Sequence, residues 1–133
     1  MECSTLRVHE KGHVAWVYLN TPAKANALSP AFWDEFPLLL GELDRRTDIH
    51  VVVLAGEGKH FCAGADIALL RQLHSVTSAA QDAAEGREAL RSEILRLQSV
   101  MTAIERLRVP VIAAIHGACI GAGVGPGGAW GAR

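Results

Sequence analysis

The chain has 133 residues, a formal net charge of −1 and an apolar share of 50%. Such a chain suits one ordinary domain with enough material for a core. Its near-neutral charge argues against electrostatic binding to nucleic acid or to a membrane surface. No run of about 18 apolar residues exists, so the sequence predicts no membrane span. Three cysteines without a C-x-x-C pair favour reduced thiols, and we expect a soluble intracellular protein.

Three segments are predicted to be strands. Residues 13–20, "HVAWVYLN", alternate and are rich in β-branched and aromatic residues. Residues 51–56, "VVVLAG", and 111–117, "VIAAIHG", are continuous apolar runs, which are typical of strands buried on both faces. Loops and helical patterns follow the strands, so we expect an α/β arrangement with parallel strands.

The first predicted helix covers residues 29–46. Ser29 stands at the N-cap, Pro30 at the first helical position, and apolar residues recur at helical spacing on one face. Pro37 interrupts this pattern and predicts a kink or a later start of the helix.

Two further helices are predicted in the second half of the chain. A short helix begins at Asp66, in "DIALLRQL", and residues 88–107 carry the clearest apolar stripe of the chain. Between them, residues 75–87 are small and polar, which predicts a mobile surface segment.

Two loops at strand ends are the candidates for chemistry: "GKHFCAGAD" (58–66) and "GACIGAG" (117–123). In parallel α/β folds, ligands bind where loops leave the carboxyl ends of the strands. The first N–H groups of a helix are unsatisfied and lie in positive potential. One N–H from each loop could therefore hold a single oxygen from two sides, an oxyanion hole that stabilises an enolate formed from a thioester carbonyl. The alternative is that small residues only permit tight strand–helix packing, and the spacing leaves both open.

Two segments that contain these loops resemble the two signature segments of the enoyl-CoA hydratase/isomerase (crotonase) superfamily. They are "GKHFCAGADI" (58–67) and "PVIAAIHGACIGAGV" (110–124). The likeness covers residues 6–124 and is greatest to the Δ3,5-Δ2,4-dienoyl-CoA isomerases of plant peroxisomal type. The resemblance implies an α/β, crotonase-like (ClpP/crotonase) fold of ββα repeats, of which this chain would contain only the N-terminal part. Residues 1–124 would be the N-terminal portion of that domain, and 125–133 an aberrant glycine-rich tail.

The resemblance also implies which residues act. The two oxyanion-hole N–H groups would belong to Ala65 and Ala122. The residues implied in binding acyl-CoA are Lys24, Ala25, Ala63, Gly64, Ala65, Asp66, Ile67 and Ala122. The implied reaction is the isomerisation of 3,5-dienoyl-CoA to 2,4-dienoyl-CoA in the β-oxidation of fatty acids. It needs no metal and no cofactor, since acyl-CoA is the substrate.

The resemblance breaks off after Val124. Where the family has an acidic residue, this chain has Gly125, which has no proton to exchange. The other catalytic acids of the family lie further along than Arg133, so we expect this polypeptide to be inactive alone. The alternatives are an enoyl-CoA hydratase of the same superfamily and a non-catalytic truncated isoform. The family further implies a homo-oligomer (trimer or hexamer) in the peroxisome, with the mitochondrion or the cytosol as alternatives.

A competing motif is G-x-G-x-x-G at Gly123, Gly125 and Gly128. Dinucleotide binding requires a helix to open there and an acidic residue about 20 positions later. Pro126 opposes such a helix, so the motif is not interpreted as a nucleotide site.

Several side chains near the loops have two interpretations. His60 and His116 flank the loops, where bonding to the backbone is a more common role than catalysis. Cys62 and Cys119 have no evident activating base, which favours inert small residues. Asp66 is a candidate general acid, but an acid at this point also suits the start of a helix.

Overall fold

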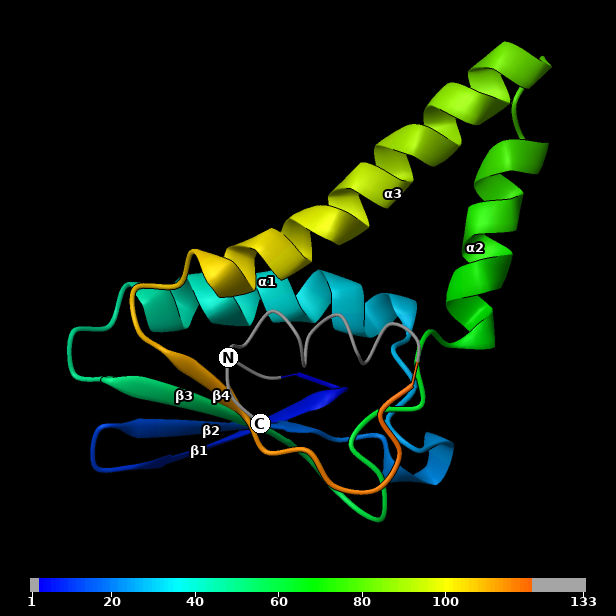
Figure 1. Ribbon diagram of the computed structural model, residues 1–133. Helices are drawn as coiled ribbons and strands as arrows, with labels where there is room; N and C mark the ends of the chain where they lie inside the picture. Colours follow the sequence, from blue (N-terminus) through cyan, green and yellow to red (C-terminus); the bar gives the residue numbers. More distant parts are fainter. Residues whose placement is uncertain (1–2, 121–133) are drawn as a thin grey trace.

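The computed structural model describes residues 3–120, and its sheet positions the candidate loops. Four strands form one sheet whose order, β1-β2-β3-β4, is also their order along the chain. β1 runs antiparallel to β2, whereas β2, β3 and β4 are parallel, so that their carboxyl ends share one edge (Figure 1). The strands are β1 (Leu6–Lys11), β2 (Val14–Leu19), β3 (Val51–Gly56) and β4 (Val111–Ala113).

The strands confirm two predictions and correct two others. β2 and β3 lie where residues 13–20 and 51–56 predict them. β4 is shorter than the predicted 111–117. The Ala114 N–H still donates to the Leu54 carbonyl at 2.8 Å, but by His116 the chain pairs with the loop after β3 instead, since the His116 carbonyl accepts from the Phe61 N–H. The pattern predicts no strand in the first twelve residues, yet β1 forms there. It is an edge strand in which Leu6 alone is fully buried, so its apolar alternation is weak.

Among residues 3–120, one α-helix lies on the sheet, two others pack over and beside that helix, and a 3-10 helix (Pro22–Lys24) lies in the loop after β2. α1 (Pro30–Asp44) lies on one face of the sheet. The C-terminal half of α3 (Ala83–Glu105) crosses over α1, and its other half reaches past the sheet, where α2 (Ile67–Ser78) packs against it (Figure 1). Within residues 3–120, none of these helices has the length and apolarity needed to cross a membrane.

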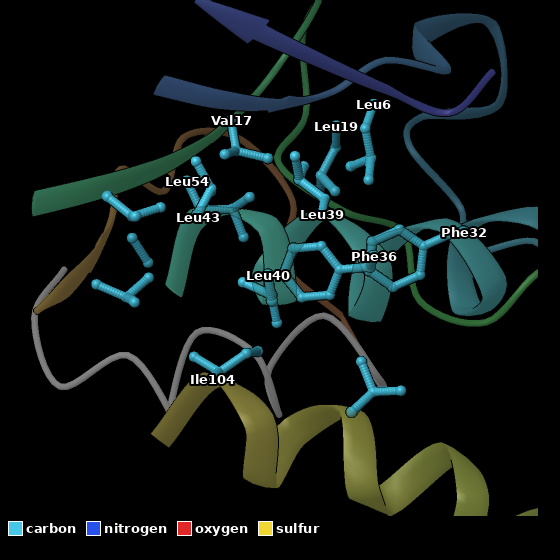
Figure 2. Packing of buried hydrophobic residues seen from close by; sticks show 14 of the residues in the cluster. Leu6, Val17, Leu19, Phe32, Phe36, Leu39, Leu40, Leu43, Leu54 and Ile104 are labelled. Carbon is cyan, nitrogen blue, oxygen red and sulfur yellow. The ribbon is translucent and has the colours of Figure 1, made fainter. Parts of the chain in front are cut away.

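The core is built around α1. The Ser29 hydroxyl accepts a hydrogen bond from the Phe32 N–H at 3.4 Å and caps the helix. Figure 2 shows the buried side chains of α1 between the sheet and Ile104 of α3. The buried side chains of α1 are Phe32, Trp33, Phe36, Leu39, Leu40 and Leu43, and those of the strands that Figure 2 labels are Leu6, Val17, Leu19 and Leu54.

Pro37 does not delay or end α1. The helix begins at Pro30 and continues past Pro37 to Asp44, so the predicted late start is wrong. A proline inside a helix costs about 3 kcal/mol through the lost hydrogen bond and the ring clash. Full burial of a large apolar side chain contributes about 1.5–3 kcal/mol. Phe36, Leu39 and Leu40, which flank Pro37, are all buried and together outweigh that cost.

The segment 75–87 is largely helical, and most of its residues are exposed, as expected for a surface segment. α2 continues to Ser78, and α3 begins at Ala83. The Asp82 carboxylate caps α3 by accepting a hydrogen bond from the Glu85 N–H at 2.7 Å. Gly86 is buried, and a Cβ there would lie 3.3 Å from the Thr77 carbonyl oxygen. The small residues therefore let α2 and α3 approach closely.

The packing of α1 can be tested with two neighbouring side chains. We expect Phe36→Ala to lower the free energy of unfolding by about 3–5 kcal/mol, because it leaves a cavity between the sheet and α3. Leu38→Ala, on the same helix but at a side chain that is 65% exposed, should change it by less than about 0.5 kcal/mol. Urea denaturation followed by circular dichroism measures both. Equal effects of the two substitutions would contradict the layer arrangement.

A carboxylate joins α1 to the start of β1. The Glu35 side chain accepts hydrogen bonds from the Ser4 N–H at 2.7 Å, and from the Thr5 N–H at 3.0 Å and hydroxyl at 2.5 Å. Burial acts to raise the pKa of Glu35, but these hydrogen bonds outweigh it, and the pKa lies below its usual value.

This lowered pKa predicts a pH dependence of stability. The contribution of Glu35 is complete above the pKa of the unfolded chain and is lost as the pH falls through the lower pKa of the folded chain. Glu35→Gln should therefore flatten the loss of stability on acidification below about pH 4.5. Thermal melting across this pH range, with the wild-type chain as reference, measures the effect. An unchanged slope would show that the Glu35 carboxylate does not act as described.

Candidate functional site

Three loops meet at the carboxyl edge of the parallel strands. They follow β2, β3 and β4 and cover residues 20–28, 57–66 and 114–120. Two isolated parallel bridges connect them outside the sheet, Leu28 with Ala65 and Cys62 with Cys119. The middle loop therefore lies between the other two (Figure 1). This edge is the place where parallel α/β folds bind their ligands.

Among residues 3–120, the bridge between the first two loops leaves the Ala65 N–H without a hydrogen-bond partner. The Leu28 N–H donates to the Gly64 carbonyl at 2.7 Å, and the Asp66 N–H donates to the Leu28 carbonyl at 3.0 Å. Because peptide groups alternate in direction along an extended chain, the Ala65 N–H faces away from Leu28. Ala65 is exposed, and no hydrogen bond among residues 3–120 uses its N–H. The Ala65 N–H is thus available to an oxygen atom of a ligand.

The bridge between the second and third loops is equally regular. The Cys62 N–H donates to the Ala118 carbonyl, and the Ile120 N–H donates to the Cys62 carbonyl, each at 3.1 Å. The Phe61 N–H donates to the His116 carbonyl at 2.8 Å. The chain after β4 is therefore held beside the loop that carries Ala65. Ala122, the other residue predicted to supply an oxyanion N–H, and the position Gly125 lie outside the described residues.

The two loop histidines bond to the backbone. His60 Nδ1 accepts a hydrogen bond from the Ala118 N–H at 3.0 Å, which places the proton of the neutral ring on Nε2. His116 Nε2 lies 2.7 Å from the Gly58 carbonyl oxygen and donates to it. Each histidine thus connects the second loop to the third, and the prediction of a structural role is confirmed.

Gly117 allows the third loop to approach the second. Its φ is +62°, and a Cβ there would lie 2.1 Å from the carbonyl oxygen of Lys59. Any other residue would force the two loops apart, so the glycine follows from geometry.

Asn26 is a site residue that the sequence patterns do not identify. It is 1% exposed, and its side-chain amide donates to the Glu57 carbonyl at 2.9 Å and the His60 carbonyl at 2.8 Å. Its oxygen accepts from the Thr21 N–H at 2.9 Å. Ala25 and Asn26 both have left-handed backbone conformations, with φ of 52° and 57°. Asparagine adopts the left-handed conformation more readily than most residues. The asparagine between two alanines was therefore the one sequence signal for a tight turn here.

Charged and capping groups complete the edge. The Asp66 carboxylate caps α2 by accepting from the Ala68 N–H at 3.1 Å, which confirms its role as a helix-opening residue. Lys24 lies with its Nζ 3.8 Å from the other oxygen of Asp66, and its side chain is exposed. Ile67 presents an exposed apolar side chain at the first position of α2. Among residues 3–120, no group of three potential metal ligands comes together.

The Cys62 thiol is fully buried in this edge. Burial raises the pKa of the Cys62 thiol, which opposes formation of a thiolate, although the Gly64 N–H donates to the sulfur at 3.4 Å. Cys62 is thus a weak nucleophile, in agreement with the prediction of an inert small residue.

The sequence model of the enoyl-CoA hydratase/isomerase family matches residues 9–126. The chain belongs to this family. A peroxisomal Δ3,5-Δ2,4-dienoyl-CoA isomerase from Arabidopsis thaliana is 44% identical over 119 residues, which are 90% of this chain and 43% of that protein. A mitochondrial Δ3,5-Δ2,4-dienoyl-CoA isomerase from Mus musculus is 40% identical over 112 residues, 84% of this chain and 34% of that protein.

A solved structure confirms the crotonase-like α/β fold. An enoyl-CoA hydratase/isomerase family protein from Hyphomonas neptunium superimposes with a TM-score of 0.79 at 31% identity. The alignment covers 96% of this chain and 45% of that protein. The chain therefore spans less than half of the length of these relatives.

For this crotonase-family chain, the structure brings most of the predicted site residues to one edge. Lys24 and Ala25 lie on the first loop, and Ala63 binds it, since its N–H donates to the Ala25 carbonyl at 3.0 Å. Gly64, Ala65, Asp66 and Ile67 follow on the second loop and the start of α2. These residues lie together at the carboxyl edge of the sheet.

The connection made by Asn26 can be tested by removing its donors. Asn26→Asp keeps the oxygen acceptor but loses the two N–H donors and buries a charge, so we expect the free energy of unfolding to fall by at least about 2 kcal/mol. Asn20→Asp, at an exposed asparagine of the same loop, is the matched control and should have little effect. Chemical denaturation measures both variants. A small effect at Asn26 would mean that its hydrogen bonds do not hold the loops together.

Proposed function

We propose that the chain provides the oxyanion-binding half of an acyl-CoA isomerase that converts 3,5-dienoyl-CoA into 2,4-dienoyl-CoA. The observation that carries this proposal is the exposed Ala65 N–H, which no hydrogen bond among residues 3–120 uses, on a loop fixed by two backbone bridges. The relatives named as dienoyl-CoA isomerases support the choice of reaction.

The proposed chemistry moves one proton along the substrate. Removing a proton from C2 of the 3,5-diene places negative charge on the thioester oxygen, and returning a proton at C6 leaves the 2,4-diene. The Ala65 N–H would donate a hydrogen bond to that oxygen, with the N–H of Ala122 as its proposed partner. Such preorganised donors contribute about 2.7–4 kcal/mol each to stabilising the transition state. Since electrons are only redistributed, we propose no metal and no redox cofactor.

We do not propose Asp66 or Glu57, the carboxylates at this edge, as the groups that move the proton. Asp66 caps α2, and Glu57 accepts a hydrogen bond from Arg7 Nε at 2.8 Å. General acid–base catalysis requires a group free to reach the substrate, and both of these carboxylates already have partners. The proposed role of this edge is therefore to bind the oxyanion and not to move the proton.

The remaining edge residues suit the coenzyme part of the substrate. The Lys24 ammonium is exposed and could pair with a phosphate, while Ala63 and Gly64 leave room for a ligand beside the backbone. Ile67 could contact an apolar part of the acyl-CoA. For the location we propose the peroxisome, with the mitochondrion as the alternative, from the names of the two relatives.

The reaction is tested with two chains, this one and one in which residues 125–133 are replaced by a family-like continuation carrying the catalytic acids. We expect only the second chain to convert 3,5-dienoyl-CoA, followed by the ultraviolet absorbance of the extended 2,4-dienoyl thioester. A folded second chain that binds acyl-CoA without turnover would refute the isomerase assignment.

The role of Ala65 is tested in the active chain by replacing its amide with an ester, which removes the N–H and keeps the side chain. We expect kcat to fall by about 10²–10³-fold, because one oxyanion donor is lost. The same replacement at Ala68, whose N–H already bonds to Asp66, is the matched control and should retain kcat within a few-fold. Equal losses at both positions would mean that the Ala65 N–H does not act on the substrate.

A further inference from the structure

Cys62 and Cys119 are direct register partners in the parallel bridge between the second and third loops. Two hydrogen bonds of 3.1 Å flank the pair, one from Cys62 to Ala118 and one from Ile120 to Cys62. They fix the register, so the two cysteines are held opposite each other although 57 positions apart along the chain (119 minus 62).

The spacing of such a bridge matches the requirements of a disulfide. Neighbouring paired strands lie about 4.8 Å apart, and disulfides join Cα atoms about 4.4–6.8 Å apart. Register partners also project their side chains to the same side of the pairing. The proximity is visible in the electrostatics as well, since charge on Cys119 contributes to the raised pKa of the Cys62 thiol.

The two thiols differ in access to solvent. Cys62 is 0% exposed, whereas Cys119 is only partly buried. A small oxidant would therefore reach Cys119 first. Burial makes the Cys62 thiol the slower of the two toward an external oxidant. Its position opposite Cys119 in the bridge is what favours the second, intramolecular step.

We propose that Cys62 and Cys119 form a disulfide that joins the two loops when hydrogen peroxide reaches this edge. The Cys119 sulfur attacks one peroxide oxygen, the O–O bond breaks, and the leaving hydroxide takes the thiol proton as water. The resulting Cys119 sulfenic acid is attacked by the Cys62 sulfur, the S–O bond breaks, and the second hydroxide leaves as water with the Cys62 proton. Two thiols are oxidised by two electrons, and one peroxide is reduced to two waters.

This disulfide is independent of the proposed isomerisation. It adds a covalent bond between two loops that are already paired, and it involves neither the Ala65 N–H nor a substrate. Cys3, the remaining cysteine of the chain, is not part of this bridge and serves as an internal reference.

The full chain is treated with hydrogen peroxide, alkylated without reduction, digested and analysed by mass spectrometry. We expect a linked peptide pair containing Cys62 and Cys119, lighter by two hydrogen atoms than the separate peptides, while Cys3 remains alkylated. Two of the three alkylation sites are thus lost, and reduction with dithiothreitol restores both.

Variants test the order of the two steps. Cys62→Ser should leave Cys119 as a sulfenic acid that dimedone traps, and Cys119→Ser should protect Cys62 from dimedone. Cys3→Ser is the matched control and should still give the linked pair. In urea, where the bridge is absent, the preference for this pair should disappear.

Three results would overturn the proposal. The first is independent oxidation of Cys62 and Cys119 to sulfinic acids without a linked peptide. The second is a bond from either cysteine to Cys3 or to another chain. The third is an unchanged preference for the pair in urea, which would show that the folded bridge does not select it.

Discussion

The packing of one helix between two layers is the constraint on which the rest of this structure depends. The buried side chains of α1 contact the sheet on one side and α3 on the other (Figure 2). This burial is strong enough to keep α1 helical through Pro37, against the cost of a lost hydrogen bond. The three loops leave β2, β3 and β4 at one edge because these strands are parallel, and the core around α1 holds the sheet that carries them.

At that edge, the main chain carries most of the geometry. Parallel bridges at Leu28–Ala65 and Cys62–Cys119 pair the loops outside the sheet, and His60 and His116 add bonds from side chain to backbone. Small residues are required because the loops approach closely. At Gly117, for example, a Cβ would lie 2.1 Å from the Lys59 carbonyl oxygen. Tight packing and an available N–H are thus two aspects of one arrangement. The two interpretations that the loop composition left open do not exclude each other.

How well the sequence predicts an element depends on whether that element is fixed by neighbouring residues or by contacts between segments far apart in the sequence. Buried strands and the amphipathic α1 were predictable from local patterns, since apolar periodicity reflects the core directly. β1 was not, because an edge strand needs few apolar residues. The helical ends of segment 75–87 were not either, because small residues are typical both of loops and of close helix contacts. The resemblance located the loop around Ala65, but Asn26 and the Cys62–Cys119 pairing depend on contacts between distant segments. No local pattern records such contacts.

The strand order β1-β2-β3-β4 has a consequence for how the protein is made. During synthesis on a ribosome the N-terminal segments emerge first, and each strand here finds its partner already present. The hairpin of β1 and β2 precedes β3, which precedes β4, so the described sheet can grow at one edge without inserting a late strand between early ones. The bridges to residues 118–120 form after the sheet. A nascent chain paused before β4 would already contain α1 but not the pairing of Cys62 with Cys119.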